Sequence, residues 1–152
     1  MNGEKRRALT LLLVLMILLT LAFIWGNSLL DREDSTRFSN GVLEALEPLL
    51  RLLGLPADDG HWIRKLAHFA EFGALGAELC LLFALYRPMR LRWIIRCALI
   101  SLAAASVDET IQLFSDRFAS VKDILLDCSG AFTGIALAYL IVCFIERRKS
   151  TE

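Results

Sequence analysis

Four long apolar runs, separated by shorter polar stretches, dominate the hydrophobic pattern of this chain. A membrane-spanning helix needs about 20 mostly apolar residues, and each run is long enough. We therefore predict transmembrane helices over residues 8–25, 66–86, 93–114 and 124–145. The first run exceeds a typical signal-peptide core and no Ala-x-Ala site follows it, so we expect it to be a retained anchor. The expected fold is all-α, an integral membrane bundle of four helices forming one domain over residues 1–152.

A fifth helical pattern lies in the long connection between the first two runs. Over residues 40–54, leucines alternate with glutamates and an arginine at helical spacing. Such a pattern is typical of an amphipathic helix lying in the membrane interface. Gly54 and Pro56 end it, and we expect Pro48 to bend the helix or to restart it. Adhesion to the membrane surface is the simpler role, and a lid over neighbouring polar residues is the alternative.

Lysine and arginine are unevenly distributed although the total charge is balanced, with 17 basic and 17 acidic residues. Basic residues precede the first run, fill the connection between the second and third, and follow the fourth: Lys5, Arg6, Arg7, Arg87, Arg90, Arg92, Arg96, Arg147, Arg148 and Lys149. Cytoplasmic ends of membrane helices are enriched in Lys and Arg. Both termini are therefore expected in the cytoplasm, with the first and third loops outside.

Composition supports the membrane class and adds no cofactor. Hydrophobic residues make up 56% of the chain, more than an ordinary soluble domain contains. The four cysteines lie in apolar runs without Cys-x-x-Cys spacing, so we interpret them as small buried hydrophobes. The balanced charge does not indicate a nucleic-acid partner. From the sequence we assign no resident metal and no cofactor, and expect membrane lipids as the surroundings.

Ionisable side chains interrupt the apolar runs, and the expected topology gathers them at one end. A charged side chain at the centre of a membrane helix costs roughly 3 kcal/mol, so such residues are rare and usually functional. The candidates for ligand binding are Arg64, Lys65, His68, Glu71, Asp108, Glu109, Gln112, Arg117, Asp123 and Asp127. We expect them to form one polar layer on the extracytoplasmic side.

Helical spacing places several of these candidates on common faces. His68 and Glu71 are one turn apart, as are Asp108 and Gln112. Glu109 is expected to point about 100° away from Asp108.

The start of the fourth helix carries two further signals. Ser120 and Asp123 resemble a capping box, with Asp123 itself a helix cap. Below them Gly130 and Gly134 form a Gly-x-x-x-Gly pattern, which lets another helix approach closely.

Three chemistries fit these residue types, and the spacing alone does not choose among them. His68 with Glu71 and Asp108 or Glu109 fits a divalent cation, although two histidines at helical spacing are missing. His68 also fits a general base oriented by a carboxylate. The catalytic candidates are therefore His68, Glu71, Asp108 and Glu109. Alternatively, basic residues would hold an anionic lipid headgroup without reaction, or all the charges would only brace the helices.

Three motifs in order carry a resemblance to a known family. They are RKLAHFAEF (64–72), DETIQLFSDR (108–117) and DILLDCSGAFTG (123–134). The chain resembles the VanZ-like family of bacterial membrane proteins over about residues 62–145. Matching positions are Arg64, Lys65, His68, Glu71, Asp108, Glu109, Gln112, Arg117, Asp123, Gly130 and Gly134.

The chain departs from the family pattern at several points. Asp127 stands where the family often has Asn, and only two residues separate Phe114 from Arg117 where three are more common. Asn27 and Ser28 lie where the family tends to have a serine.

The resemblance implies a multi-pass protein of the bacterial inner membrane and cell envelope. Some members are linked to lower glycopeptide (teicoplanin-type) susceptibility, but the resemblance implies no particular reaction. Our leading hypothesis is an outward-facing pocket that binds an anionic or amphiphilic ligand such as a lipid-linked cell-wall component. Arg64, Lys65 and Arg117 would contact the anion. A membrane enzyme and a non-catalytic scaffold are the alternatives.

Overall fold

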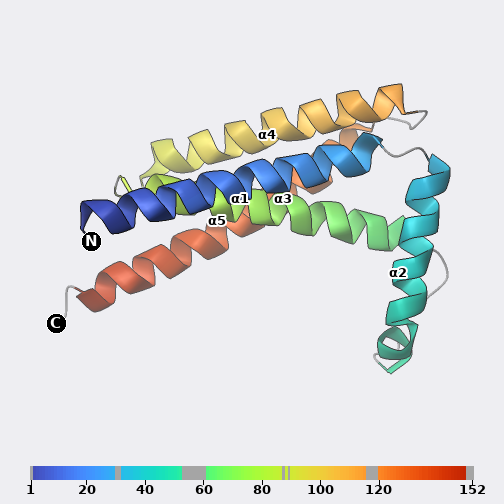
Figure 1. The fold of residues 1–152 in the computed structure, drawn as a ribbon, viewed down its shortest axis with the longest axis horizontal. Coiled ribbons are helices and arrows are strands. Elements are labelled where there is room, and N and C mark those ends of the chain that lie inside the picture. Colours follow the sequence, from blue (N-terminus) through green and yellow to red (C-terminus); the bar gives the residue numbers. More distant parts are fainter. Residues whose placement is uncertain are drawn as a thin grey trace.

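The chain folds into helices throughout the residues that the computed structural model describes, which are 2–29, 32–52, 61–86, 88, 90–115 and 120–149. The helices are α1 (Gly3–Leu29), α2 (Arg32–Leu52), α3 (His61–Ala84), α4 (Leu91–Phe114) and α5 (Val121–Lys149). These ranges contain no strand, which confirms the predicted all-α class. Helices α1, α3, α4 and α5 run along one common axis, and α2 crosses the end of the bundle (Figure 1).

Each of the four predicted apolar helices is present, and most extend beyond their apolar run. Helix α1 begins at Gly3 and α5 continues to Lys149, both through charged residues. Hydropathy marks the part of a helix that fits hydrocarbon, whereas backbone hydrogen bonds continue into the polar flanks. The second predicted helix ends slightly early, because Leu85 and Tyr86 form a turn after α3.

The predicted number of membrane spans is supported in part. Three described helices are long and apolar enough to cross a membrane, over Gly3–Leu29, Trp62–Ala84 and Val121–Arg148. Helix α4 has 24 residues but is not among them. Its acidic residues Asp108 and Glu109 are buried inside the bundle. Facing the interior is how membrane helices accommodate ionisable side chains.

Helix α2 begins earlier than the predicted amphipathic segment, at Arg32 and not at residue 40. It continues through Pro48 to Leu52, so the helix does not restart at Pro48, and the alternative of a bend there stays a prediction. Proline removes one backbone hydrogen bond inside a helix. Pro48 and Glu44, whose carbonyl loses that bond, are both exposed, so water can satisfy the carbonyl. The predicted end signals, Gly54 and Pro56, lie outside the described residues.

Glycines bring α3 and α5 into backbone contact. A Cβ atom added at Gly134 would collide with the backbone carbonyl of Gly73, and one at Gly130 would collide with that of Phe69. Small residues allow such approach between membrane helices, where packing rather than hydrophobicity drives association. The Gly-x-x-x-Gly pattern thus serves the close approach predicted for it, and the partner within this chain is α3.

Helix α1 is attached to the bundle by a few polar and buried groups. Thr20 Oγ1 donates to Glu78 Oε1 at 3.0 Å, and Trp25 Nε1 donates to the carbonyl of Ala104 at 3.4 Å. Ile24 between them is fully buried. Most leucines of α1 are exposed, as expected for side chains that face lipid.

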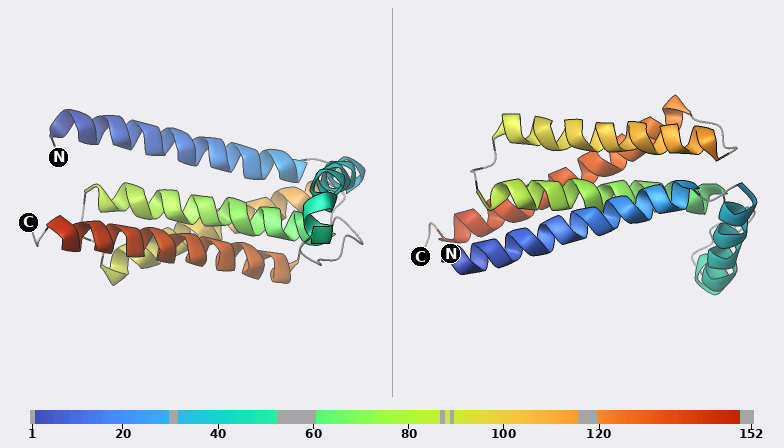
Figure 2. Two further views of the ribbon diagram at one scale, coloured as in Figure 1. Left: turned by 90° about the horizontal axis from the view of Figure 1, so that it is seen from below. Right: turned by 45° about the horizontal axis from the view of Figure 1, so that its top comes forward.

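The two ends of the bundle carry different segments of the chain and different kinds of side chain. The N- and C-termini lie together at one end, and α2 lies at the other (Figures 1 and 2). Exposed arginines such as Arg6, Arg92 and Arg148 belong to the end with the termini. The buried polar residues Ser28, Asp108, Gln112 and Asp127 lie toward the α2 end, whereas Glu78 and Ser101 lie farther from it.

Candidate functional site

A group of buried polar side chains, which we call the polar cluster, lies between the helices near the α2 end. It consists of Ser28 from α1, His68 from α3, Asp108 and Gln112 from α4, and Asp127 from α5. Asp108 and Ser28 are fully buried, and the side chain of His68 is 14% exposed. Four helices far apart in sequence therefore deliver polar groups to one place, as the predicted polar layer requires.

Asp108 is held on both sides by hydrogen bonds. Ser28 Oγ donates to Oδ1 at 2.7 Å, and Gln112 Nε2 donates to Oδ2 at 2.8 Å. The same Gln112 amide also lies 3.2 Å from Ser28 Oγ. Two donors from separate helices fix the carboxylate in one orientation. Ser28 was not among the predicted site residues, and the family's preference for a serine in this region was the signal for it.

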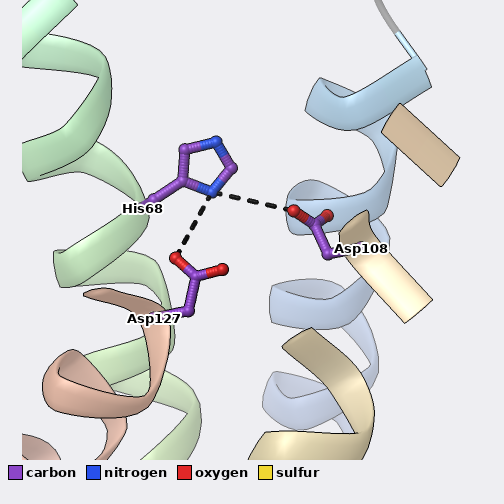
Figure 3. Close-up of side chains that lie close together, drawn as sticks. All are labelled: His68, Asp108 and Asp127. Atoms are coloured by element: carbon purple, nitrogen blue, oxygen red, sulfur yellow. Dashed lines mark ion pairs between the residues drawn. The ribbon is translucent and has the colours of Figure 1, made fainter. Parts of the chain in front are cut away.

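His68 lies between the two aspartates. Its Nδ1 is 3.9 Å from Asp108 Oδ2 and also 3.9 Å from Asp127 Oδ1. Figure 3 shows this nitrogen directed toward both carboxylates, with the other ring nitrogen directed away from them. These distances are longer than a hydrogen bond. The three side chains therefore point toward one common space but stay apart across it.

The α3–α5 contact explains why His68 and Asp127 meet. His68 directly precedes Phe69, whose carbonyl lies against Gly130, and Asp127 lies just under one turn before that glycine. A larger residue at position 130 would push the helices apart and separate the two side chains. The same small residues that pack the helices therefore determine the width of the site.

Glu71 lies beside the polar cluster and adds negative charge. Its Oε1 accepts a hydrogen bond from Asn27 Nδ2 at 3.3 Å. It is close enough to Asp108 and Asp127 for the carboxylates to repel one another. The polar cluster with Glu71 thus contains three carboxylates and one imidazole. This charge balance suits a bound cation or a hydrogen-bond donor better than a bare anion.

Glu109 has a different partner from Asp108, as its predicted direction required. It is 4% exposed, and its Oε2 accepts a hydrogen bond from the backbone N–H of Ser120 at 2.8 Å. Ser120 Oγ in turn accepts from the backbone N–H of Lys122 at 3.2 Å.

The predicted capping box is therefore only half right. Ser120 caps α5 through its hydroxyl. The reciprocal bond to the Ser120 N–H comes from Glu109 on α4, so the prediction that Asp123 supplies it is wrong. A side chain from another helix replaces the local partner, which sequence spacing alone does not reveal.

The basic candidates lie at the rim of the site. Lys65 Nζ is 4.0 Å from Asp123 Oδ1, and the two side chains are 46% and 37% exposed. Arg64 is partly buried in the first turn of α3. Arg117 lies outside the described residues. The structure thus separates an acidic centre from a basic margin, where the sequence predicted one mixed layer.

Ser28 is not placed as a serine nucleophile of the usual kind. Ser28 Oγ directs its hydrogen to Asp108, whereas a catalytic serine is activated by a hydrogen bond to histidine. What remains is a buried imidazole flanked by carboxylates.

A comparison with protein families matches the VanZ/LLP1 family over residues 8–142. The match includes every member of the polar cluster and extends the resemblance seen in the three motifs to α1. Searches of curated proteins and of solved structures gave no match.

Proposed function

Because the chain belongs to the VanZ/LLP1 family of membrane proteins, we propose that it acts in the bacterial cell envelope as a binding protein. Its polar cluster would open to the extracytoplasmic side of the inner membrane. The ligand would be an amphiphile such as a lipid-linked cell-wall component, whose anionic headgroup would contact the basic margin of the site at Lys65 and Arg64 and not the acidic polar cluster.

The charge distribution supports this orientation. Arginines Arg6, Arg92 and Arg148 are exposed at the end that carries both termini. Lys and Arg favour the cytoplasmic side of membrane helices. The polar cluster lies toward the opposite end, where envelope precursors would meet the membrane.

The observation that carries the binding proposal is the open arrangement around His68. A bracing ion pair would close to hydrogen-bond distance, because desolvated charges need direct partners to repay their burial. His68 Nδ1 instead lies 3.9 Å from each of two buried carboxylates. Charged groups that are buried at a cost in free energy and yet stay 3.9 Å apart favour a site that binds a ligand between them.

The margin of the site supports an amphiphilic guest. Lys65 makes only a long, half-exposed contact with Asp123, and such surface pairs contribute roughly 0–1 kcal/mol. Lys65 can therefore exchange this partner for a phosphate, with Arg64 beside it. Exposed apolar side chains at the same end, among them Leu66, Phe114 and Val121, offer a surface for a lipid chain. Sequestering such a ligand would be the route to an effect on glycopeptide susceptibility.

One observation also favours an acid–base enzyme as a second candidate. The carboxylates face Nδ1 of His68, and the other ring nitrogen is directed away from them. A carboxylate that orients one nitrogen prepares the other for proton transfer. Turnover of a bound lipid phosphate would favour this candidate over simple binding.

Native mass spectrometry of the purified protein with a polyprenyl phosphate tests the binding proposal. We expect the phosphate to bind and the uncharged polyprenol to bind at least about tenfold more weakly, because a hydrogen bond to a charged group contributes about 1.5–3 kcal/mol. The double variant Arg64→Gln/Lys65→Gln should lose affinity by a similar factor. Its matched control is Arg147→Gln/Arg148→Gln at the other end of the bundle, which should bind normally. Equal binding of phosphate and alcohol would refute an anion site.

A further inference from the structure

We propose that His68, Asp108 and Asp127 form a binding site for a divalent transition-metal ion. One possible ligand atom from each residue lies within 4.8 Å of the others. The three residues come from three helices, α3, α4 and α5, and their side chains face one another (Figure 3). The site goes beyond the proposed lipid binding and does not depend on it.

The distances fit an ion after a small contraction. Metal–ligand bonds of about 2.0–2.2 Å at tetrahedral angles separate ligand atoms by roughly 3.4 Å. His68 Nδ1 lies 3.9 Å from the nearest oxygens of both aspartates. The three ligand atoms lie within 4.8 Å of one another, so rotamer adjustments of roughly 0.5–1.4 Å would bring them into coordination. Three protein ligands would leave further positions for water or for an oxygen of a bound molecule, as in catalytic zinc sites.

Asp127 supplies the independent indication that something is held here. It is 1% exposed, and its Oδ1 has no hydrogen-bond partner among the described residues. Buried carboxylate oxygens are ordinarily satisfied. Asp127 Oδ1 is directed toward His68. An ion between the two side chains would therefore provide the partner that this oxygen lacks.

The surroundings of Asp108 match those of a metal ligand. Ser28 and Gln112 each donate a hydrogen bond to its carboxylate. Outer hydrogen bonds of this kind orient ligands and are a regular part of metal sites.

The ligand set indicates the class of ion. Imidazole favours Zn²⁺, Fe²⁺ and related ions, while carboxylates alone would suit Mg²⁺ or Ca²⁺. One histidine with two aspartates therefore favours a borderline ion such as Zn²⁺ or Fe²⁺ over Mg²⁺. Because the side chain of His68 is partly exposed, an ion can reach the site beside it.

The test uses the full-length protein in detergent micelles, stripped with a chelator and then titrated with Zn²⁺, Co²⁺ or Mg²⁺. We expect about one tightly bound Zn²⁺ per chain by elemental analysis, and a visible Co²⁺ spectrum typical of four-coordination. Zn²⁺ should raise the unfolding temperature, because an ion that binds only the folded state stabilises it. Wild-type protein that binds no Zn²⁺, or binds Mg²⁺ equally well, would overturn the proposal without any variant.

Substitutions of the proposed ligands test where the ion binds. Asp127→Asn and His68→Asn should weaken Zn²⁺ binding at least about a hundredfold, near the upper loss seen when ligand support is removed. The matched control is Asp123→Asn, the same change one turn earlier on α5 in a side chain that is 37% exposed, and it should bind normally. If Asp127→Asn fails to fold, the Co²⁺ spectrum of His68→Asn decides alone. Zn²⁺ affinity unchanged in the folded variants would overturn this site.

Discussion

Replacing Gly134 with alanine is expected to destabilise the protein by about 3 kcal/mol, the upper range for overpacking a tight interface. The added methyl group would meet the backbone carbonyl of Gly73, which is not the end of a flexible side chain and cannot move aside. Helices α3 and α5 would have to separate. Because His68 and Asp127 lie on these two helices, the same change should widen the site. Unfolding by heat or by a denaturing detergent measures the loss.

Gly26 provides the control for this experiment. It also lies within a helix, α1, but an added Cβ there would meet nothing within 4 Å. Alanine is favoured over glycine in a helix by about 1 kcal/mol, so Gly26→Ala should be neutral or slightly stabilising. Equal losses for the two variants would show that the α3–α5 contact is not the tight interface described above.

Replacing Asp108 with alanine is expected to cost about 2–6 kcal/mol, because two buried donors lose their acceptor at about 1–3 kcal/mol each. Ser28 Oγ and Gln112 Nε2 both donate to this carboxylate. The variant should therefore unfold at a clearly lower temperature. Calorimetry or a thermal shift measurement in detergent would record the change.

Asp123→Ala is the matched control for Asp108→Ala. Its side chain is 37% exposed and makes one long contact with Lys65, so the expected loss is below about 1 kcal/mol. If Asp108→Ala were as mild as this control, the hydrogen bonds from Ser28 and Gln112 would not hold the site together.

Much of the fold could be predicted because membrane helices have a strong local signal. Apolar length located α1, α3, α4 and α5, and the small residues on α5 indicated a close helix contact. Helix α4 gave a weaker signal because it contains Asp108, Glu109 and Gln112, which the fold buries in the bundle interior. The hydropathy of a helix does not tell which of its sides is covered by neighbours.

The sequence indicated which residues gather near one another better than it indicated which contacts they make. The expected topology gathered His68, Asp108 and Asp127 at one end, and the structure brings them together. It did not reveal that Glu109 would reach Ser120, because that bond joins different helices. Ser28 lies at the end of an apolar helix and carries no charge, so nothing in the hydrophobic pattern separates it from an ordinary helix-end serine.

Cysteine labelling at the two ends of α5 tests the central claim, which is that the polar cluster faces outward. Lys122 and Glu146 are both exposed, near the start and near the end of this helix. In a variant whose native cysteines are replaced by alanine, Lys122→Cys and Glu146→Cys would be treated in intact cells with a membrane-impermeant maleimide. Labelling is expected at position 122 from outside and at position 146 only after permeabilisation. The reverse pattern would place the polar cluster in the cytoplasmic half of the membrane and contradict the proposed function.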